Sequence, residues 1–452
     1  MKLTKLSLIA MLLIGSSAFA IENTKVSGDA KFYYGTQDSD ASGAPDMFNE
    51  DASYANFAAR LDLTTDLTKG VSAGVGMQVV TTLGIEHNLM SNTWSSAHTT
   101  DDSRGSSYGN EESIDSAMWV DEAWLAGSAF DTTMKIGRQA LETPLAFSET
   151  WGVDKNTFEA VVLINQSLPD TTLIATYIGK SNGSADNQGT DNITGAAAGY
   201  VGANGDFETF GSDGTYAYGI VNNSVEPLVL QAWYYDMQSL AKAYWLQADL
   251  KVGGLMLGAQ FANTDADSLG DLAAYLSPAV IAGLPGSITD VDDTTMFSAM
   301  VGYEFKDVMT VKAAVSSVSD DGTLGMGNTA TGAAATIGGQ SRMYTENWWN
   351  YGNVSAVGSD SYSLTAEGTV GDDITLFAGF YYADIDPDSS SNAVASLEEK
   401  EFTQFTVTAS KSFGPLDTSL AVIFADADYD ESTTTNTDVT TTDIQLYLTY
   451  NF

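Results

Sequence analysis

The feature that most constrains the fold is a strict alternation of apolar and polar positions, clearest near the carboxyl end. Ile444, Leu446, Leu448, Tyr450 and Phe452 alternate with Asp443, Gln445, Tyr447, Thr449 and Asn451. A period of two indicates a β-strand with one apolar face. The segment is about as long as the roughly 9 to 11 residues that a tilted transmembrane strand needs. It is therefore predicted to be a membrane strand.

Segments with the same period recur along the chain. Examples lie at 56–64, 71–79, 244–251, 297–305, 362–370 and 374–382, and in each of them charge occupies one parity only. This pattern is typical of strands that face lipid on one side and water on the other. After residue 20 no stretch reaches the roughly 18 uninterrupted apolar residues of a membrane helix. A chain of this kind enters a bilayer as a closed barrel, because closure pairs every backbone polar group.

Connections between the expected strands alternate in length. Short turns lie near 67–70, 131–132, 168–170, 222–227, 252–253, 306–308, 371–373 and 413–416. Long polar segments lie near 36–51, 84–116, 141–157, 180–214, 263–293, 318–360, 384–401 and 426–441, with a brief one at 237–242. This order predicts an all-β, antiparallel transmembrane barrel of 18 strands with periplasmic termini. Sixteen strands is the alternative, because single barrel strands give weak signals.

The first twenty residues are predicted to be a cleaved signal peptide. Lys2 and Lys5 precede an apolar run from Leu6 to Ile14, and Ala18-Phe19-Ala20 supplies the small residues of a cleavage site. Residues 21–452 are then a single exported barrel domain.

Composition excludes several functions. The chain has 59 acidic and 18 basic residues and a net charge of −41, whereas binding of nucleic acid needs a basic surface. It has no cysteine, which excludes disulfides, thiolate zinc sites and cysteine nucleophiles. Its two histidines, His87 and His98, lie in one long segment, and no Gly-x-Ser-x-Gly motif is present. We therefore expect no enzyme activity.

Two short blocks resemble a known family. Residues 135–145 read KIGRQALETPL, and residues 156–160 read NTFEA. They resemble the signature GRQ-x-L-x-T/S-P followed by N/T-TFE-G/A of the OprD-like outer-membrane porins and of the major outer-membrane porins of Campylobacter-type bacteria. The terminal Phe452 is similar to the signal that the barrel-assembly machinery reads. Arginine is scarce, with only Arg60, Arg104, Arg138 and Arg342. This departs from the basic ladder of OprD-type porins and favours the cation-preferring Campylobacter type.

The resemblance implies a porin in the outer membrane of a Gram-negative bacterium, in contact with lipid and lipopolysaccharide and assembled as a homotrimer. It also implies that the loop at 141–157 folds inward and narrows a water-filled channel for ions and small hydrophilic solutes. Two alternatives stay open: a substrate-specific porin, and a surface adhesin anchored by its barrel.

Charged residues of this loop and of neighbouring strands are the candidate constriction. Selectivity depends on the charges that project where a channel is narrowest. Glu142, Glu149 and Asp154 lie in the loop, and Glu159 is opposite in parity to Phe158 and Ala160, which predicts that it faces the lumen. The same parity argument predicts that four further residues face the lumen: Arg60, Asp62, Lys135 and Asp249. A preference for cations is expected.

Arg138 shares the parity of Met134 and Ile136, which would turn it toward lipid at a cost of roughly 2 to 4 kcal/mol at the midplane. We expect it near the loop end of its strand, paired with a carboxylate, either anchoring the loop or steering ions. Asp121 and Glu122 are neighbours within a strand and are expected to put one charge on each face. Asp121 and Asp154 are the candidate ligands for Ca²⁺, a metal that oxygen donors suit; no cofactor is required.

Aromatic residues cluster at Tyr33-Tyr34, Trp233-Tyr234-Tyr235, Trp348-Trp349 and Tyr381-Tyr382. Membrane-interface girdles account for most such residues in a barrel. The alternative is a platform on which sugars stack. Because Trp348-Trp349 lies in a long loop, packing within a loop plug is a further interpretation.

Overall fold

The computed structural model describes residues 22–85, 89–90, 116–183, 207–210, 213–267, 291–330, 339–371, 373–386, 399–429 and 438–452. The predicted signal peptide and its cleavage site, both histidines and Arg104 lie outside these ranges. Within the described ranges, no helix is long and apolar enough to span a bilayer.

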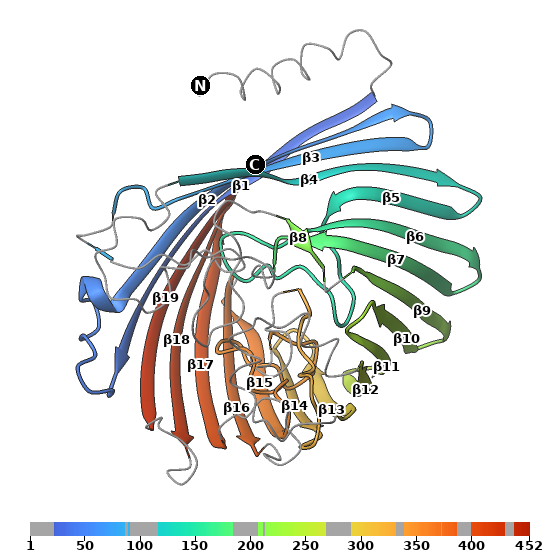
Figure 1. Cartoon of the computed structure of the whole chain (residues 1–452). Coiled ribbons are helices and arrows are strands. Elements are labelled where there is room, and N and C mark those ends of the chain that lie inside the picture. Colours follow the sequence, from blue (N-terminus) through green and yellow to red (C-terminus); the bar gives the residue numbers. More distant parts are fainter. Residues whose placement is uncertain are drawn as a thin grey trace.

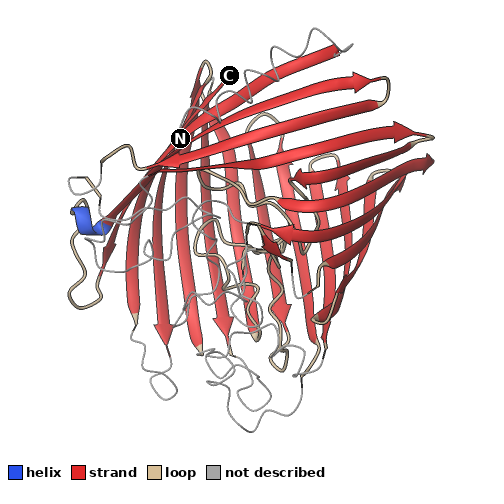
Figure 2. Ribbon diagram, turned by 45° about the horizontal axis from the view of Figure 1, so that its top comes forward, coloured by secondary structure: helices blue, strands red, loops and turns tan. Residues whose placement is uncertain are grey.

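Long antiparallel strands form one closed barrel (Figures 1 and 2). They are β1 (Glu22–Ser39), β2 (Ser53–Thr68), β3 (Val71–Thr81), β4 (Ser116–Ala129), β5 (Thr132–Gln139), β6 (Phe158–Leu168), β7 (Thr171–Ser181), β9 (Thr215–Val225), β10 (Leu228–Met237), β11 (Ala241–Val252), β12 (Leu255–Ala266), β13 (Thr294–Phe305), β14 (Met309–Val318), β15 (Ser359–Val370), β16 (Ile374–Ile385), β17 (Lys400–Phe413), β18 (Leu416–Tyr429) and β19 (Val439–Asn451). The short strand β8 (Glu208–Thr209) pairs with the end of β7, and η2 (Glu50–Ala52) is a 3-10 turn.

The wall therefore has 18 strands, and the predicted count is confirmed against the alternative of 16. Each strand pairs with the next in sequence, and β1 pairs with β19 to close the ring. Gly28 and Phe452 exchange both backbone hydrogen bonds at this seam, with N···O distances of 2.9 and 3.0 Å. A Cβ on Gly28 would overlap the backbone carbonyl oxygen of Arg60 on β2 and would also meet the Phe452 ring. The seam thus needs glycine there, and closure leaves no unpaired strand edge.

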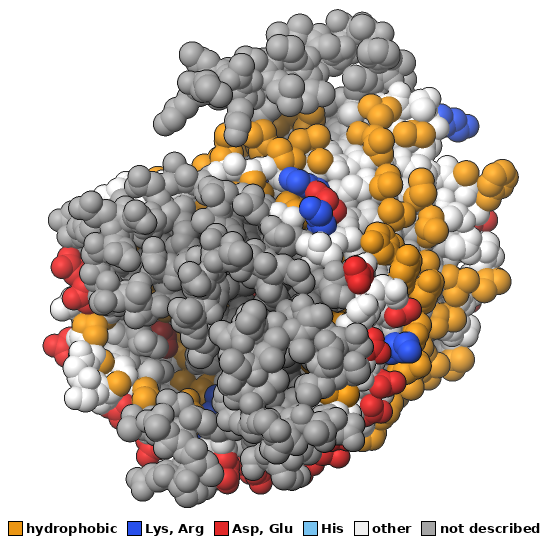
Figure 3. All heavy atoms as spheres, in the orientation of Figure 1, with side chains coloured by type: hydrophobic (Ala, Val, Ile, Leu, Met, Phe, Trp, Pro, Cys, Tyr) orange, Lys and Arg blue, Asp and Glu red, His pale blue; other side chains and the backbone are white. Residues whose placement is uncertain are grey.

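The outer face of the wall is apolar. Leu125, Ile136, Phe297 and Leu364 are each about half exposed, at 45 to 58%. Figure 3 shows hydrophobic side chains as a band over the outer wall at the right of the view, with acidic side chains near its rim. An exposed apolar band of this kind is what a barrel presents to lipid.

Outward-facing tyrosines form a belt near the loop ends of β7, β9, β10 and β11. Tyr177 lies 4.9 Å from Tyr216, Tyr218 lies 6.4 Å from Tyr234, and Tyr234 lies 5.1 Å from Tyr244, measured between ring centroids. The structure therefore divides the sequence cluster Trp233-Tyr234-Tyr235. Tyr234 joins the outer belt, as the girdle interpretation predicts.

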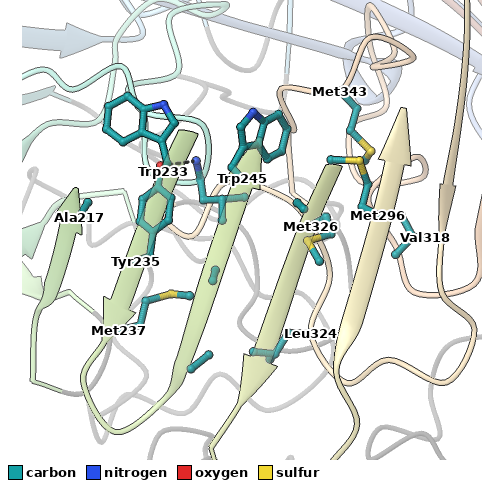
Figure 4. Packing of buried hydrophobic residues seen from close by; sticks show 14 of the residues in the cluster. Ala217, Trp233, Tyr235, Met237, Trp245, Met296, Val318, Leu324, Met326 and Met343 are labelled. Carbon is teal, nitrogen blue, oxygen red and sulfur yellow. Dashed lines mark hydrogen bonds between the residues drawn. The ribbon is translucent and has the colours of Figure 1, made fainter. Parts of the chain in front are cut away.

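The other two residues of that cluster, Trp233 and Tyr235, point inward and are buried. With Trp245, Met296 and Met326 they belong to a hydrophobic core on the inner wall (Figure 4). Leu324, Met326 and Met343 of this core come from the segment between β14 and β15. The lumen is therefore partly filled by chain that packs against the wall.

Candidate functional site

The loop between β5 and β6, residues 140–157, crosses the lumen. Leu145 packs against Trp233 of β10, and its backbone N–H donates to the Tyr235 hydroxyl at 3.3 Å. Val153, farther along the loop, packs with Tyr33 of β1 and Ala58 of β2. Because β10 is roughly half a turn of the barrel from β1 and β2, the loop contacts opposite walls. The predicted inward fold is confirmed.

A second loop, residues 319–358 between β14 and β15, interlocks with the first. The Asn328 side chain donates to the Phe147 carbonyl oxygen at 2.9 Å and to Glu149 Oε1 at 3.0 Å, and its Oδ1 accepts from the Phe147 N–H at 3.1 Å. The Thr329 hydroxyl donates to the Leu145 carbonyl oxygen at 2.6 Å. Sequence reasoning did not assign this loop to the constriction; its one available signal was Trp348-Trp349 in a polar segment.

Arg60 is the centre of a charged cluster on the inner wall. Its guanidinium contacts Asp62 at 2.8 Å, Asp121 at 3.0 Å and Glu122 at 2.8 Å. Lys155 of the first loop contacts Glu122 Oε1 at 2.6 Å. The side chains of Arg60 and Asp121 are only 11% and 1% exposed. The ion pair between Lys155 and Glu122 therefore ties the loop to the wall.

The expectation that Asp121 and Glu122 point to opposite faces is wrong. Gly76 of β3 pairs with Glu122, whereas Met77 pairs with Val120, so Asp121 is an extra residue in a β-bulge. A bulge breaks the alternation of faces, and both carboxylates consequently reach Arg60. Glycine at 76 leaves the room for this, since a Cβ there would lie 2.7 Å from Asp62 Oδ1 and 2.8 Å from Asp121 Oδ1.

The same cluster bears on the predicted calcium site at Asp121 and Asp154. The described residues contain no group of three or more His, Asp or Glu side chains that could hold a metal ion. Arg60 and Lys155 supply positive charge beside Asp121 and Glu122, and Asp154 is buried within its loop at 3% exposure. The donor set does not fit a calcium ion.

Lys135 also lies on the inner wall, at the strand next to this cluster. Its Nζ is 4.3 Å from the centroid of the Trp124 ring. Trp124 in turn donates to Glu122 Oε2 at 3.3 Å. Parity therefore brings Arg60, Asp62 and Lys135 to one patch of the lumen.

The parity argument is wrong for Glu159, and the pore-lining assignment of Arg138 fails with it. Glu159 pairs with Arg138 across β5 and β6, at 2.9 Å from Nε to Oε1. They share their face with the exposed Met134 and Leu163, which pair in the same ladder. Apolar residues of β6 face inward instead, because Phe158 and Ala160 pack under the loop residues Leu141 and Ala146.

Arg138 does lie at the loop end of its strand with a carboxylate partner, as expected. It also donates to the Val120 carbonyl oxygen at 2.8 Å, and the ring of Phe207 covers its guanidinium at 4.0 Å. These contacts satisfy a charge on the outer face of the barrel. None of these three partners lies in the loop 140–157, so the contacts support neither the loop-anchoring alternative nor the ion-steering one.

Further carboxylates line the inner wall and the two loops. Asp249 of β11 accepts from the Tyr344 hydroxyl at 2.6 Å and from Gln247 at 2.7 Å. Glu142 pairs with Arg342 of the second loop at 2.5 Å. Glu149 Oε2 accepts from the Trp151 indole at 3.1 Å.

Glu346, which sequence reasoning did not single out, belongs to the second loop, and the charge of Glu149 in the first loop acts on it. Its carboxylate accepts from the backbone N–H groups of Ser341 and Asn347. Burial raises the pKa of Glu346 to about 7; these hydrogen bonds oppose the shift, and the charge of Glu149 adds to it. Its charge therefore changes near neutral pH.

Comparison with proteins of known structure identifies the fold of this chain. No protein-family model and no curated sequence matches the chain. Among solved structures it is similar to OccAB1 of Acinetobacter baumannii (TM-score 0.67, 14% identity, 96% of this chain and 98% of that chain covered). It is also similar to OccK8 (OprE) of Pseudomonas aeruginosa (0.66, 14%, 95% and 98%) and to OpdK of the same organism, solved with vanillate (0.66, 13%, 95% and 99%). The likeness to the OprD-like barrels is thus one of architecture, and the Campylobacter-type assignment is not confirmed.

Proposed function

We propose that this chain is a porin of the Gram-negative outer membrane, with a water-filled channel for ions and small hydrophilic solutes. The closed 18-strand wall, its apolar outer band and its tyrosine belt fit a bilayer. A barrel of this size leaves an aqueous lumen unless it is plugged. The two interlocked loops reduce that lumen to a constriction.

The channel is proposed to prefer cations, and one observation carries this: three basic groups at the constriction are paired with carboxylates, whereas several lumenal carboxylates are held by neutral donors. Arg60, Lys155 and Arg342 each contact a carboxylate. Asp249 and Asp443 accept from tyrosine hydroxyls and glutamine amides. Uncompensated negative charge in a low-dielectric passage concentrates cations.

A substrate-specific porin is the second candidate. The observation that favours it is that the two loops fill much of the lumen, where they pack together through Leu145, Met326 and Met343. The passage that remains is therefore structured rather than an open pore. OpdK was solved with vanillate, an aromatic carboxylate. The carboxylates of this lumen disfavour such an anion.

Assembly as a homotrimer and insertion through the assembly machinery are further proposals. The outer face would supply both the lipid contact and the subunit interface, since both are apolar. Chemical cross-linking of the protein in its membrane, followed by denaturing electrophoresis, distinguishes a trimer from a monomer.

Planar-bilayer recording tests the channel proposal. Purified full-length protein should give discrete conductance steps, and a KCl gradient should give a reversal potential of the sign that K⁺ permeation produces. Heat-unfolded protein is the control for contaminants. Absence of steps from a correctly folded barrel, or a reversal potential set by Cl⁻, contradicts the proposal.

A further inference from the structure

The lumen holds an aromatic cavity separate from the Arg60 cluster. Its volume is about 440 Å³, and it lies between the two inward loops and the inner wall of β16, β18 and β19. Six aromatic residues line it: Trp151, Trp348, Trp349, Tyr351, Tyr381 and Tyr447. Its volume falls within the range of about 300 to 1,000 Å³ that is usual for small-molecule sites.

The aromatic rings form a rigid base with accessible walls. Trp349 and Tyr381 are 5% and 3% exposed, whereas Trp151, Trp348 and Tyr447 are partly exposed. Trp151 meets Trp349 edge to face at 5.3 Å, and Trp348 meets Tyr447 edge to face at 6.4 Å. Edge-to-face packing of this kind fixes ring orientation. Ring faces are therefore available to a ligand without rearrangement of the base.

Polar groups border the same cavity. Glu346, Asn347 and Ser419 are among its lining residues. Hydrogen bonds hold several groups in place: the Tyr447 hydroxyl donates to Gln445 at 2.8 Å, and the Tyr351 hydroxyl donates to the Trp348 carbonyl oxygen at 3.2 Å. A site that is ordered before binding loses little conformational entropy when a ligand enters.

We propose that this cavity binds a neutral carbohydrate. A sugar ring has an apolar face whose C–H hydrogens suit the negative face of an aromatic ring, and its hydroxyl edge suits the polar border. The carboxylates of Glu346 and Glu149 disfavour an acidic ligand. The inference rests on the proposed channel function, because the cavity lies inside the barrel, between the two inward loops and the inner wall, where a solute arrives only through the channel.

Fluorescence titration tests the inference on the whole folded protein. Maltose, a neutral disaccharide, should change tryptophan emission saturably. Two probes give the alternatives: benzoate for an aromatic anion and tetraethylammonium for a cation held by ring faces. Saturable binding of either of these without binding of maltose overturns the proposal.

Variants locate the site. Trp348→Ala should weaken maltose binding about tenfold, which matches the upper range for loss of one aromatic contact, and Trp348→Phe should retain most of it. Phe377→Ala is the matched control, since Phe377 lies on the same face of β16 as Tyr381 but does not line the cavity. Equal weakening by the Phe377 variant, or none by Trp348→Ala, contradicts the assignment.

Current recordings separate this inference from the channel proposal. Maltose should reduce the open-channel current of the unmodified protein reversibly, and Trp348→Ala should relieve the block. A conducting channel that neither binds maltose nor is blocked by it overturns the carbohydrate site and leaves the porin. Maltose binding by a barrel that never conducts supports the cavity and overturns the porin.

Discussion

At the scale of single residues, Arg60 balances the carboxylates of the inner wall. Replacing it by methionine leaves the buried Asp121 beside Asp62 and Glu122 without its guanidinium. Removing one partner of a buried ion pair costs about 3 to 5 kcal/mol. We expect Arg60→Met to lower the free energy of unfolding by about 3 kcal/mol, since Lys155 still neutralises Glu122.

Urea unfolding in lipid vesicles measures this effect. Arg138→Met is the matched control, because the Arg138–Glu159 pair is about one-third exposed and exposed pairs contribute about 0 to 1 kcal/mol. Equal losses from the two substitutions would show that the Arg60 cluster is no more important than a surface pair.

Titration of Glu346 should make both the stability of the protein and the charge of its lumen depend on pH. The pKa of Glu346 is raised to about 7, so the folded protein holds this proton over the range from about 4.5 to 7 in which the unfolded chain releases it. As the pH rises across that window, the free energy of unfolding therefore falls, and the lumen gains a negative charge. Cation selectivity should therefore increase between pH 6 and 8.

Reversal potentials recorded at a series of pH values test this, and Glu346→Gln should flatten the curve. Asp249→Asn serves as the comparison, because it should lower selectivity while leaving the increase with pH intact. A Glu346→Gln channel with an unchanged pH profile would exclude this carboxyl as the titrating group.

At the scale of elements, the two inward loops depend on each other. Asn328 alone makes three hydrogen bonds to the first loop, so Asn328→Ala should loosen the constriction and leave Phe147 and Glu149 with unsatisfied groups. Shortening 141–157, with Gly137–Gln139 and Phe158-Glu159 kept, should raise the single-channel current.

Single-channel recording of the loop variants distinguishes the two contributions. Because the loops interlock, shortening 319–358 should also raise the current, and the effects of the two deletions should not be additive. Unchanged current after shortening 141–157 would assign the constriction to the second loop alone.

The elements also show how far sequence alone reaches. Period-two alternation predicted membrane strands because each strand repeats the same physical constraint, and the alternation of short turns with long loops predicted that there are 18 of them. It failed at Glu159, since alternation distinguishes two faces without identifying the inner one when loop residues such as Leu141 bury apolar side chains inside. The bulge at Asp121 and the contact of Asn328 with Phe147, 181 residues apart, depend on pairing between distant segments. No local sequence pattern indicates either the bulge or this contact.

At the scale of the whole molecule, charge is unevenly placed. Asp360, Asp384, Glu401 and Asp428 stand directly opposite one another across β15 to β18, at the loop ends of these strands. Like charges in facing positions repel, so this row adds a negative field at the rim. Screening limits its reach to about 8 Å at 0.15 M salt but about 30 Å at 0.01 M. Rim and lumen charges should therefore act under different conditions.

The measurement that tests the account most directly is the cation-to-anion permeability ratio at these two salt concentrations. The unmodified channel should prefer cations at both. Asp249→Asn should lower the ratio at 0.15 M as well as at 0.01 M, because ions pass close to that carboxylate, whereas the double variant Asp384→Asn, Glu401→Gln should lower it only at 0.01 M. Anion preference in the unmodified channel, or equal effects of the two sets of substitutions at both concentrations, would contradict the claim that lumenal carboxylates set the selectivity.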